Sequence, residues 1–251
     1  MGVSNFTRVI WKLGHQGYEK DLARAASVYS KAEYEMVKQG LRLAATYHVD
    51  SEKIKEEYER FEKDDLIFTP LRKSAYYSGF SHCHVTPESG QPFYYYGALT
   101  RTKTVGKEFL NADTTGNHLI IGELLGFPGC CTEAFTKDFA VDYDPIWLTR
   151  QGEVPGFPEC NQLLRYFGIR ATSHFSCTPL CNQTKNVASL WLDVMKSLDE
   201  SAAKLLYTFL GSPITWDSYH GVVEVDTPHF LGVTHTSTHL TKRVISFKPV
   251  V

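Results

Sequence analysis

Two short cysteine-rich segments, far apart in the chain, constrain the fold more than any other feature. They are Gly126–Phe135 (GFPGCCTEAF) and His174–Cys181 (HFSCTPLC), and together they hold four of the six cysteines. In the first segment a proline–glycine pair interrupts whatever precedes, and apolar residues then recur at helical spacing. In the second, serine or threonine can cap a helix and proline suits its first turn. The sequence therefore predicts that each cysteine pair lies at the N-terminus of a helix.

Cysteines at helix N-termini favour a particular chemistry. The free backbone N–H groups and the positive end of the helix dipole stabilise a thiolate, and they also stabilise an anionic metal–sulfur centre. The adjacent pair is Cys130 and Cys131, and the spaced pair is Cys177 and Cys181, four residues apart and so on one side of a helix. The alternative is that these four are only small buried apolar residues. If they share a centre, we expect their sulfurs to lie within about 10 Å of one another, because metal–sulfur bonds are only about 2.3 Å long.

The composition is that of an ordinary globular protein. The chain has 251 residues, is 43% hydrophobic and 22% charged, and carries a formal net charge of -2. We therefore expect no nucleic-acid partner, and no apolar run reaches the roughly 18–20 residues that a membrane span needs. The N-terminus has no signal-peptide pattern, so we expect a cytoplasmic protein whose cysteines are thiols or metal ligands rather than disulfides. The oligomeric state stays open.

The first part of the chain, residues 1–68, is predicted to be a helical region. Apolar residues recur at helical spacing from about Tyr18 to Val49, with Gly40 dividing two helices. A third helix is expected from a cap at Asp50 or Ser51 to about Lys63. This region carries little visible chemistry, which indicates a helical layer or a partner surface.

The character of the sequence changes at Thr69–Pro70, and residues 69–251 are predicted to be an α+β domain that holds the cysteines. Turn signals and β-rich runs alternate there with helical patterns. Together with the helical start, this predicts a single globular unit of the α+β class, with N-terminal and central helices and antiparallel strands. The expected strands are 74–85, 93–104, 219–225, 230–235 and 242–247, and the expected helices are 114–125 and 179–210.

Two further cysteines and an aromatic run are weaker candidates for site residues. His82-Cys83-His84 has the composition of a metal site, but a pair of surface histidines explains it as well, and Cys83 is predicted not to be a ligand. Cys160 ends a short echo of the first cysteine segment, so we expect at most an auxiliary role. The run Phe93–Tyr96 reads as a packed strand, or as the wall of a pocket for an anionic or planar ligand.

The chain resembles an uncharacterised family of prokaryotic proteins, best known from archaea and classed as a domain of unknown function. The resemblance rests on Leu125–Cys131, His174–Cys181 and Trp216–Pro228, which are similar to the family's GYPxCC, HxPCSxxC and YHGxxExxTP segments, and it covers about residues 118–230. It implies a cysteine-bound centre of the iron–sulfur kind but no defined reaction. Thr178-Pro179 departs from the family order, in which proline precedes the cysteine, so the backbone there is expected to differ.

The leading hypothesis is an iron–sulfur-dependent enzyme that acts on a small molecule. Three or four of the paired cysteines would hold the cluster, of which [4Fe–4S] is one form, and an open iron would act as a Lewis acid. This chemistry suits a lyase, a hydrolase or an enzyme of sulfur chemistry. The acid–base candidates are His174, His220 and Glu224, since histidine titrates near neutral pH and a carboxylate can orient it. A purely structural His220–Glu224 pair is the alternative.

Two other classes of function remain open at this point. Zinc bound by the same cysteines would staple two helices and support a binding surface. Thiol chemistry without metal would use Cys131 or Cys177, activated by a helix N-terminus and His174. The substrate is not encoded in any motif that we find.

Overall fold

The computed structural model describes residues 7–75, 86–139, 151–219, 222–234 and 242–250. By its contacts the chain divides into two compact units. Unit 1 comprises residues 1–32 and 130–251, and unit 2 comprises residues 33–129. The chain passes from one to the other inside the first helix and again at the double cysteine.

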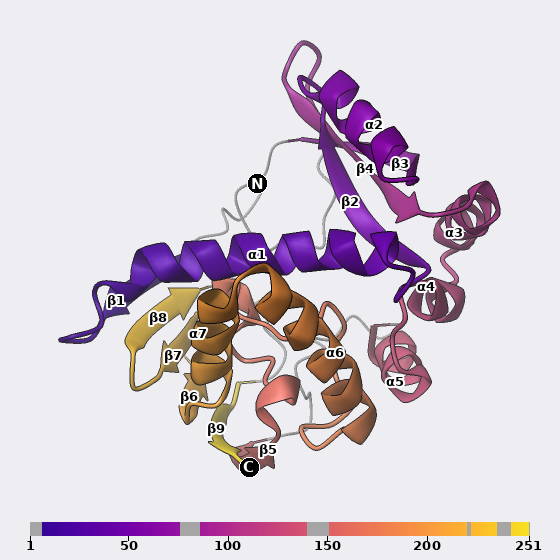
Figure 1. Cartoon of the computed structure of the whole chain (residues 1–251). Coiled ribbons are helices and arrows are strands. Elements are labelled where there is room, and N and C mark those ends of the chain that lie inside the picture. The colour runs from indigo at the N-terminus through magenta and orange to yellow at the C-terminus, as the bar shows by residue number, and fades with distance from the viewer. Residues whose placement is uncertain (1–6, 76–85, 140–150, 220–221, 235–241, 251) are drawn as a thin grey trace. The chain divides into compact units, whose positions relative to one another are not determined.

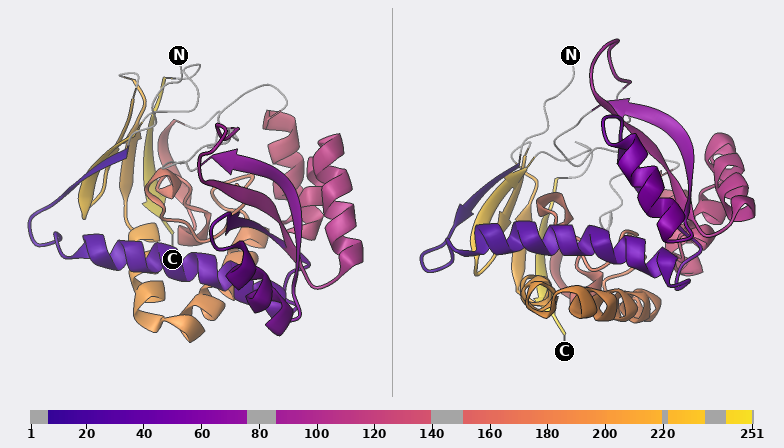
Figure 2. Two further views of the ribbon diagram at one scale, coloured as in Figure 1. Left: turned by 90° about the horizontal axis from the view of Figure 1, so that it is seen from above. Right: turned by 45° about the horizontal axis from the view of Figure 1, so that its top comes forward.

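Unit 1 is built on a six-stranded sheet with the order β1-β8-β7-β6-β9-β5. All neighbours pair antiparallel except β5 and β9, which are parallel. The later strands lie side by side in the orange and yellow part of both views of Figure 2. The strands are β1 (Thr7–Trp11), β5 (Gly152–Gly156), β6 (Ile214–Asp217), β7 (Val223–Asp226), β8 (Phe230–Thr234) and β9 (Val244–Pro249).

Helices complete the core of unit 1 through large aromatic side chains. Phe209 packs against Phe230 of β8 with ring centroids 6.2 Å apart, and Trp191 stacks on Tyr29 at 5.2 Å. Trp191, Phe209 and Phe230 are fully buried, and burial of such rings is the main favourable term in folding. The helices are α1 (Tyr18–Lys38), α5 (Gly129–Phe139), α6 (Asn182–Leu198) and α7 (Glu200–Leu210), of which α1 continues into unit 2 (Figure 1). There are also two short 3₁₀ turns, η1 (Pro158–Cys160) and η2 (Arg165–Phe167).

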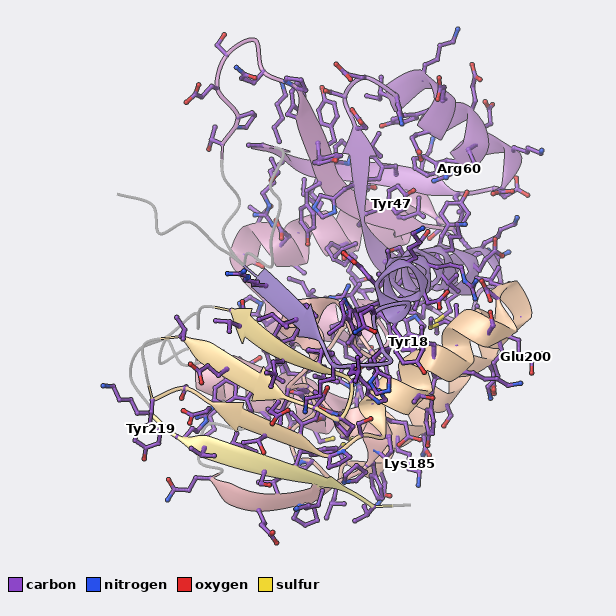
Figure 3. All side chains as sticks on the ribbon, turned by 90° about the vertical axis from the view of Figure 1, so that its left-hand side faces the viewer. Tyr18, Tyr47, Arg60, Lys185, Glu200 and Tyr219 are labelled. Carbon is purple, nitrogen blue, oxygen red and sulfur yellow. The ribbon has the colours of Figure 1, made fainter. Side chains whose placement is uncertain are left out.

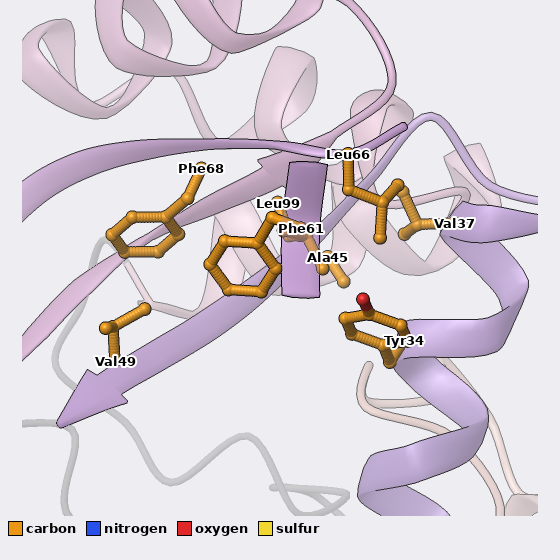
Figure 4. Close-up of a cluster of buried hydrophobic side chains, with 8 residues drawn as sticks. All are labelled: Tyr34, Val37, Ala45, Val49, Phe61, Leu66, Phe68 and Leu99. Atoms are coloured by element: carbon orange, nitrogen blue, oxygen red, sulfur yellow. The ribbon is translucent and has the colours of Figure 1, made fainter. Parts of the chain in front are cut away.

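Unit 2 is a three-stranded antiparallel sheet, order β2-β4-β3, with helices on both faces. Successive residues of a strand face opposite sides. Ala45 of β2 accordingly joins the cluster around Phe61 of α2, shown in Figure 4, whereas Ala44 joins a second cluster with Phe109 of α3 and Leu124 of α4. The elements are β2 (Ala44–Asp50), α2 (Ile54–Lys63), β3 (Ile67–Ala75), β4 (Phe93–Thr100), α3 (Lys103–Thr115) and α4 (His118–Leu124).

The α+β class predicted from the sequence is confirmed, but one predicted helix is a strand. Gly40, with a φ of 74°, ends α1, and the residues after it form β2 instead of a second helix. The sequence of β2 does not show the alternation of polar and apolar residues that is typical of a strand. Ala44 and Ala45 are both buried, because they lie on opposite faces of a sheet that is covered on both sides. Tertiary packing decides between the two readings.

The long helix predicted over 179–210 is two helices. Asp199 has extended backbone and accepts a hydrogen bond from the Ala202 N–H at 3.0 Å, so it caps α7 and breaks the apolar stripe. The first of the two helices begins at Asn182 and not at Pro179. The sequence did not predict helix α3 or the strands β1, β3, β5 and β6; β3 overlaps the strand expected over 74–85 only at its end. Thr102 caps α3 where the sequence suggested a continuing strand.

Several predictions concern parts of the chain outside the described residues. They are Cys83 with its flanking histidines, His220, and most of the strand expected over 74–85. The predicted domain boundary at residue 68 stays a prediction; the compact units instead place β2, β3 and β4 together, because they share one sheet. In the part of the chain that the structure covers, no helix has the length and apolar character required to cross a membrane.

Candidate metal centre

The four predicted cysteines converge in unit 1. We call Cys130, Cys131, Cys177 and Cys181 the cysteine quartet; all four sulfurs lie within 4.8 Å of one another. The Cys131–Cys181, Cys130–Cys131 and Cys130–Cys181 sulfur distances are 3.6, 3.8 and 3.9 Å. The convergence predicted from the two segments is therefore confirmed. Neither His174 nor any carboxylate among the described residues belongs to this group.

The double cysteine follows a glycine that ends one helix and precedes the next. Helix α4 ends at Leu124 with Leu125 as its C-cap, and Gly126 adopts a φ of 68°, a conformation that glycine reaches without steric cost. Helix α5 then starts at Gly129, as the sequence predicted, so both cysteines lie in its first turn. Cys131 is buried and Cys130 is exposed. One sulfur of the pair thus points inward and the other stays at the surface.

The second cysteine pair lies in a loop that ends at the start of α6. Cys181 is the N-cap, and its sulfur accepts a hydrogen bond from the Thr184 N–H at 3.4 Å. Cys177 precedes the helix and is half-buried, so the two sulfurs meet through the loop and not through helical spacing. The Phe157 N–H donates to the Pro179 carbonyl at 2.9 Å and fixes the loop against the end of β5.

Hydrogen bonds from neighbouring groups converge on the sulfurs. The Cys177 N–H donates to the Cys131 sulfur at 3.4 Å, and the Thr184 hydroxyl lies 3.2 Å from the same sulfur. Such bonds favour the thiolate, the form that binds metals. Phe157 packs against the cysteines, and the Nζ atom of Lys185, a residue labelled in Figure 3, lies 4.3 Å from the Phe157 ring centroid.

The pKa values of the cysteine quartet differ from one residue to the next. Burial raises the pKa of Cys177 to about 12 and also raises the pKa of Cys131. Burial opposes ionisation of Cys181 as well, but the Thr184 hydrogen bonds and the thiols of Cys131 and Cys177 outweigh it and lower its pKa to about 7. Four thiolates this close repel one another, so full ionisation requires a bound cation.

His174 lies one hydrogen bond away from the cysteine quartet. It is buried, 5% exposed, and its Nε2 is 2.9 Å from the Thr184 hydroxyl that contacts Cys131. The Thr184 hydroxyl therefore links the His174 ring to the Cys131 sulfur. Its predicted acid–base role stays a prediction. No sequence signal marked Thr184 for this position, because the contact depends on the turn of α6.

None of the other described candidates belongs to the cysteine quartet. Glu224 is exposed on β7, opposite Asp217 of β6, while its neighbours Val223 and Val225 face the core. His220, its expected partner, lies outside the described residues. Cys160 is buried beside the quartet, but its thiol donates to the Cys181 carbonyl at 3.5 Å and burial raises its pKa to about 12. Cys160 is thus a neighbour of the site and not part of the group of four.

Comparisons of the chain with family models, with curated proteins and with solved structures found no match. The resemblance to the uncharacterised prokaryotic family therefore stays a prediction. What the structure shows is a group of four cysteines that can bind a metal ion.

Proposed function

We propose that the cysteine quartet binds one Zn²⁺ ion as a closed structural site, and that the protein is a zinc-stapled module. The observation that carries the proposal is the sulfur spacing. Four sulfurs placed about 2.3 Å from one ion, at the corners of a tetrahedron, lie about 3.8 Å apart. The three sulfur distances given above, 3.6 to 3.9 Å, match this value.

The ligand type supports zinc and a structural role. A tetrahedral set of four thiolates is typical of structural zinc, whereas catalytic zinc keeps a position for water. With all four positions taken by Cys130, Cys131, Cys177 and Cys181, no site is left for a substrate on the metal. The ion would hold the start of α5 to the loop that leads into α6. Metal binding would then add directly to the folding free energy of unit 1.

An iron–sulfur cluster on the same cysteines is the second candidate. Its support is that Cys130 is exposed and Cys177 only half-buried, so one side of the site has room for a larger inorganic core. Helix N-termini and N–H···S bonds suit such a cluster as well. Against it, cluster sulfurs bind separate irons and must stand farther apart than sulfurs that share one ion. The small-molecule enzyme predicted from the sequence depends on this candidate.

Metal analysis of anaerobically purified protein separates the two. For the zinc site we expect about one zinc per chain, no acid-labile sulfide, and a colourless protein that gives tetrahedral sulfur-ligand bands after Co²⁺ substitution. A brown protein that contains iron and sulfide would contradict the zinc proposal and support the iron–sulfur cluster. Protein that binds neither metal would remove both.

A matched pair of variants tests the ligand set. Cys130→Ser and Cys160→Ser each replace one sulfur with oxygen in the same neighbourhood, but only Cys130 belongs to the quartet. We expect Cys130→Ser to lose most of its zinc in a chelator competition and Cys160→Ser to keep it. Equal loss in both variants would show that the quartet has the wrong members.

A further inference from the structure

A small polar cavity in unit 1 lies next to the segment that carries the second cysteine pair. Glu159, Gln162, Ala171, His174 and Thr184 are among the residues that line it. Its volume is about 10 Å³, close to the roughly 10–15 Å³ that one water molecule requires on the same measure. The cavity therefore admits a single non-hydrogen atom.

Two of the residues that line this cavity each carry a buried oxygen atom with no hydrogen-bond partner among the described residues. The two atoms are Glu159 Oε2 and Gln162 Oε1, on side chains only 7% and 5% exposed. The other carboxylate oxygen of Glu159 accepts from the Tyr207 hydroxyl at 3.3 Å. A buried acceptor without a donor destabilises the folded protein, so two such acceptors on residues that line one cavity call for a shared donor.

The orientation of the Gln162 amide is fixed by its other contacts. Its NH₂ group donates to the Ser176 carbonyl at 3.2 Å and contacts the Ser176 hydroxyl at 2.5 Å. A flipped amide would place oxygen against that carbonyl oxygen, which has no proton to give. The Gln162 carbonyl oxygen must therefore be the atom on the opposite side, away from Ser176.

We infer that this cavity binds one water molecule, which donates one proton to Glu159 and the other to Gln162. Water supplies two donors from one heavy atom, which is what the two acceptors and the volume require. An ammonium ion would also donate, but the Arg165 and Arg170 side chains line the same cavity and disfavour a further cation.

The water site goes beyond the proposed metal site and does not depend on it. It joins η1 to Gln162, and Gln162 holds Ser176, the residue directly before Cys177. The Ser176 hydroxyl in turn donates to the Cys160 carbonyl at 3.3 Å. Bound water would thus be a part of the scaffold that places the second cysteine pair.

Oxygen-17 relaxation dispersion of water counts the molecules that stay bound longer than the protein takes to tumble, so it tests the inference in the purified chain with or without bound zinc. Ala171→Val adds two methyl groups to a cavity wall, and we expect it to release one such water. Ala23→Val, on the exposed face of α1, should keep the wild-type count. A folded Ala171→Val variant with an unchanged count would overturn the proposal.

A crystal structure of the wild-type chain gives a second test that requires no variant. We expect electron density for one atom within hydrogen-bond distance of both Glu159 Oε2 and Gln162 Oε1. A cavity without density, or one closed by a direct side-chain contact, would refute the water site. The presence or absence of zinc does not enter this reading, so the two proposals fail independently.

Discussion

The Thr184 side chain connects the buried His174 to the sulfurs of the cysteine quartet. Its hydroxyl lies 3.2 Å from the Cys131 sulfur and 2.9 Å from His174 Nε2, and its N–H donates to Cys181. A hydroxyl donates one proton and accepts others. If it donates to the Cys131 thiolate, it accepts from the His174 ring, which fixes the proton of His174 on Nε2. Groups in this position set the orientation and affinity of metal ligands.

Thr184→Val should weaken metal binding while leaving the ligands in place. The substitution keeps the shape and the backbone N–H to Cys181 but removes the hydroxyl between Cys131 and His174. We expect zinc affinity to fall by about 10–100-fold, the usual effect of losing such a partner. Thr184→Ser keeps the hydroxyl and is the control, with affinity near wild type. Competition with a chromophoric chelator measures both, and equal affinities would argue that the hydroxyl has no part in binding.

His229 gives unit 1 a dependence on pH near neutrality. Burial, together with the nearby charges of His15 and Lys12, lowers its pKa below the ordinary value of 6.5. Its Nε2 is 2.9 Å from the Ser212 hydroxyl, and its ring lies 4.8 Å from that of Phe209. As pH falls below 6.5 the unfolded chain takes up a proton more readily than the folded chain, so stability decreases until the lower, folded pKa is passed.

The prediction is that the melting temperature falls between pH 7 and pH 5.5 and that His229→Gln reduces this fall, because glutamine does not titrate. His118→Gln, in unit 2, tests whether loss of any histidine has the same effect. Thermal unfolding followed at several pH values measures all three proteins. An identical pH dependence in wild type and His229→Gln would contradict the assignment.

At the scale of residues, the sequence predicted those that carry chemistry by their type. Cysteine pairs at helix starts are visible without a structure, so the quartet was predicted and converges. Thr184 and Gln162 were not, since threonine and glutamine are common and only tertiary contacts bring them to Cys131 and Ser176. His174 is predicted to be an acid–base group, and the structure places its Nε2 2.9 Å from the Thr184 hydroxyl.

At the scale of elements, the elements that were predicted well are those with a clear period and a clear stop. Helix α1 ends at Lys38, just before the Gly40 that the sequence indicated as a break, and α5 starts at Gly129. The failures have several causes, the first of which is that burial on two faces removes the period. Strand β2 is buried on both sides, and α6 and α7 form one apolar stripe that only the Asp199 cap divides. Short edge strands such as β5 have too few residues to show a pattern.

Gly156 shows how closely two elements meet at the metal site. A Cβ atom at this position would lie 2.4 Å from the Phe247 ring and 3.0 Å from Pro179, which belongs to the loop between Cys177 and Cys181. Gly156→Ala should therefore force the loop away from β5 and destabilise the fold by about 1–3 kcal/mol. Gly17→Ala is the control, because nothing lies within 4 Å of its added atom. Urea unfolding measures both, and equal stabilities would show that the loop yields freely.

At the scale of the whole molecule, the proposed metal site lies in one unit, and each unit has a core of its own. The four cysteines of the quartet belong to unit 1, whereas unit 2 has its own buried clusters around Phe61 and Phe109. Local stability differs across proteins when cooperative units have separate cores. Bound zinc should therefore stabilise unit 1 directly, whereas the stability of unit 2 should depend on the packing of its own core.

Removal of zinc is expected to raise amide hydrogen exchange in one unit only. After chelation, exchange in α6 and in the segment before it should speed up by roughly tenfold or more, because the loop that holds Cys177 loses its anchor to Cys131. Exchange in β2 and β4 should stay close to its original rate. Mass spectrometry of peptic fragments reads both units in one experiment.

The control is Cys130→Ser, which lacks a ligand before any chelator is added. Its exchange should already resemble that of the chelated wild type and should change little on further chelation, since there is little zinc left to remove. An equal acceleration in both units of the wild type would mean that the chain unfolds as one cooperative body. Unchanged exchange rates in both units would mean that the ion binds without holding α5 to the start of α6, which would contradict its proposed structural role.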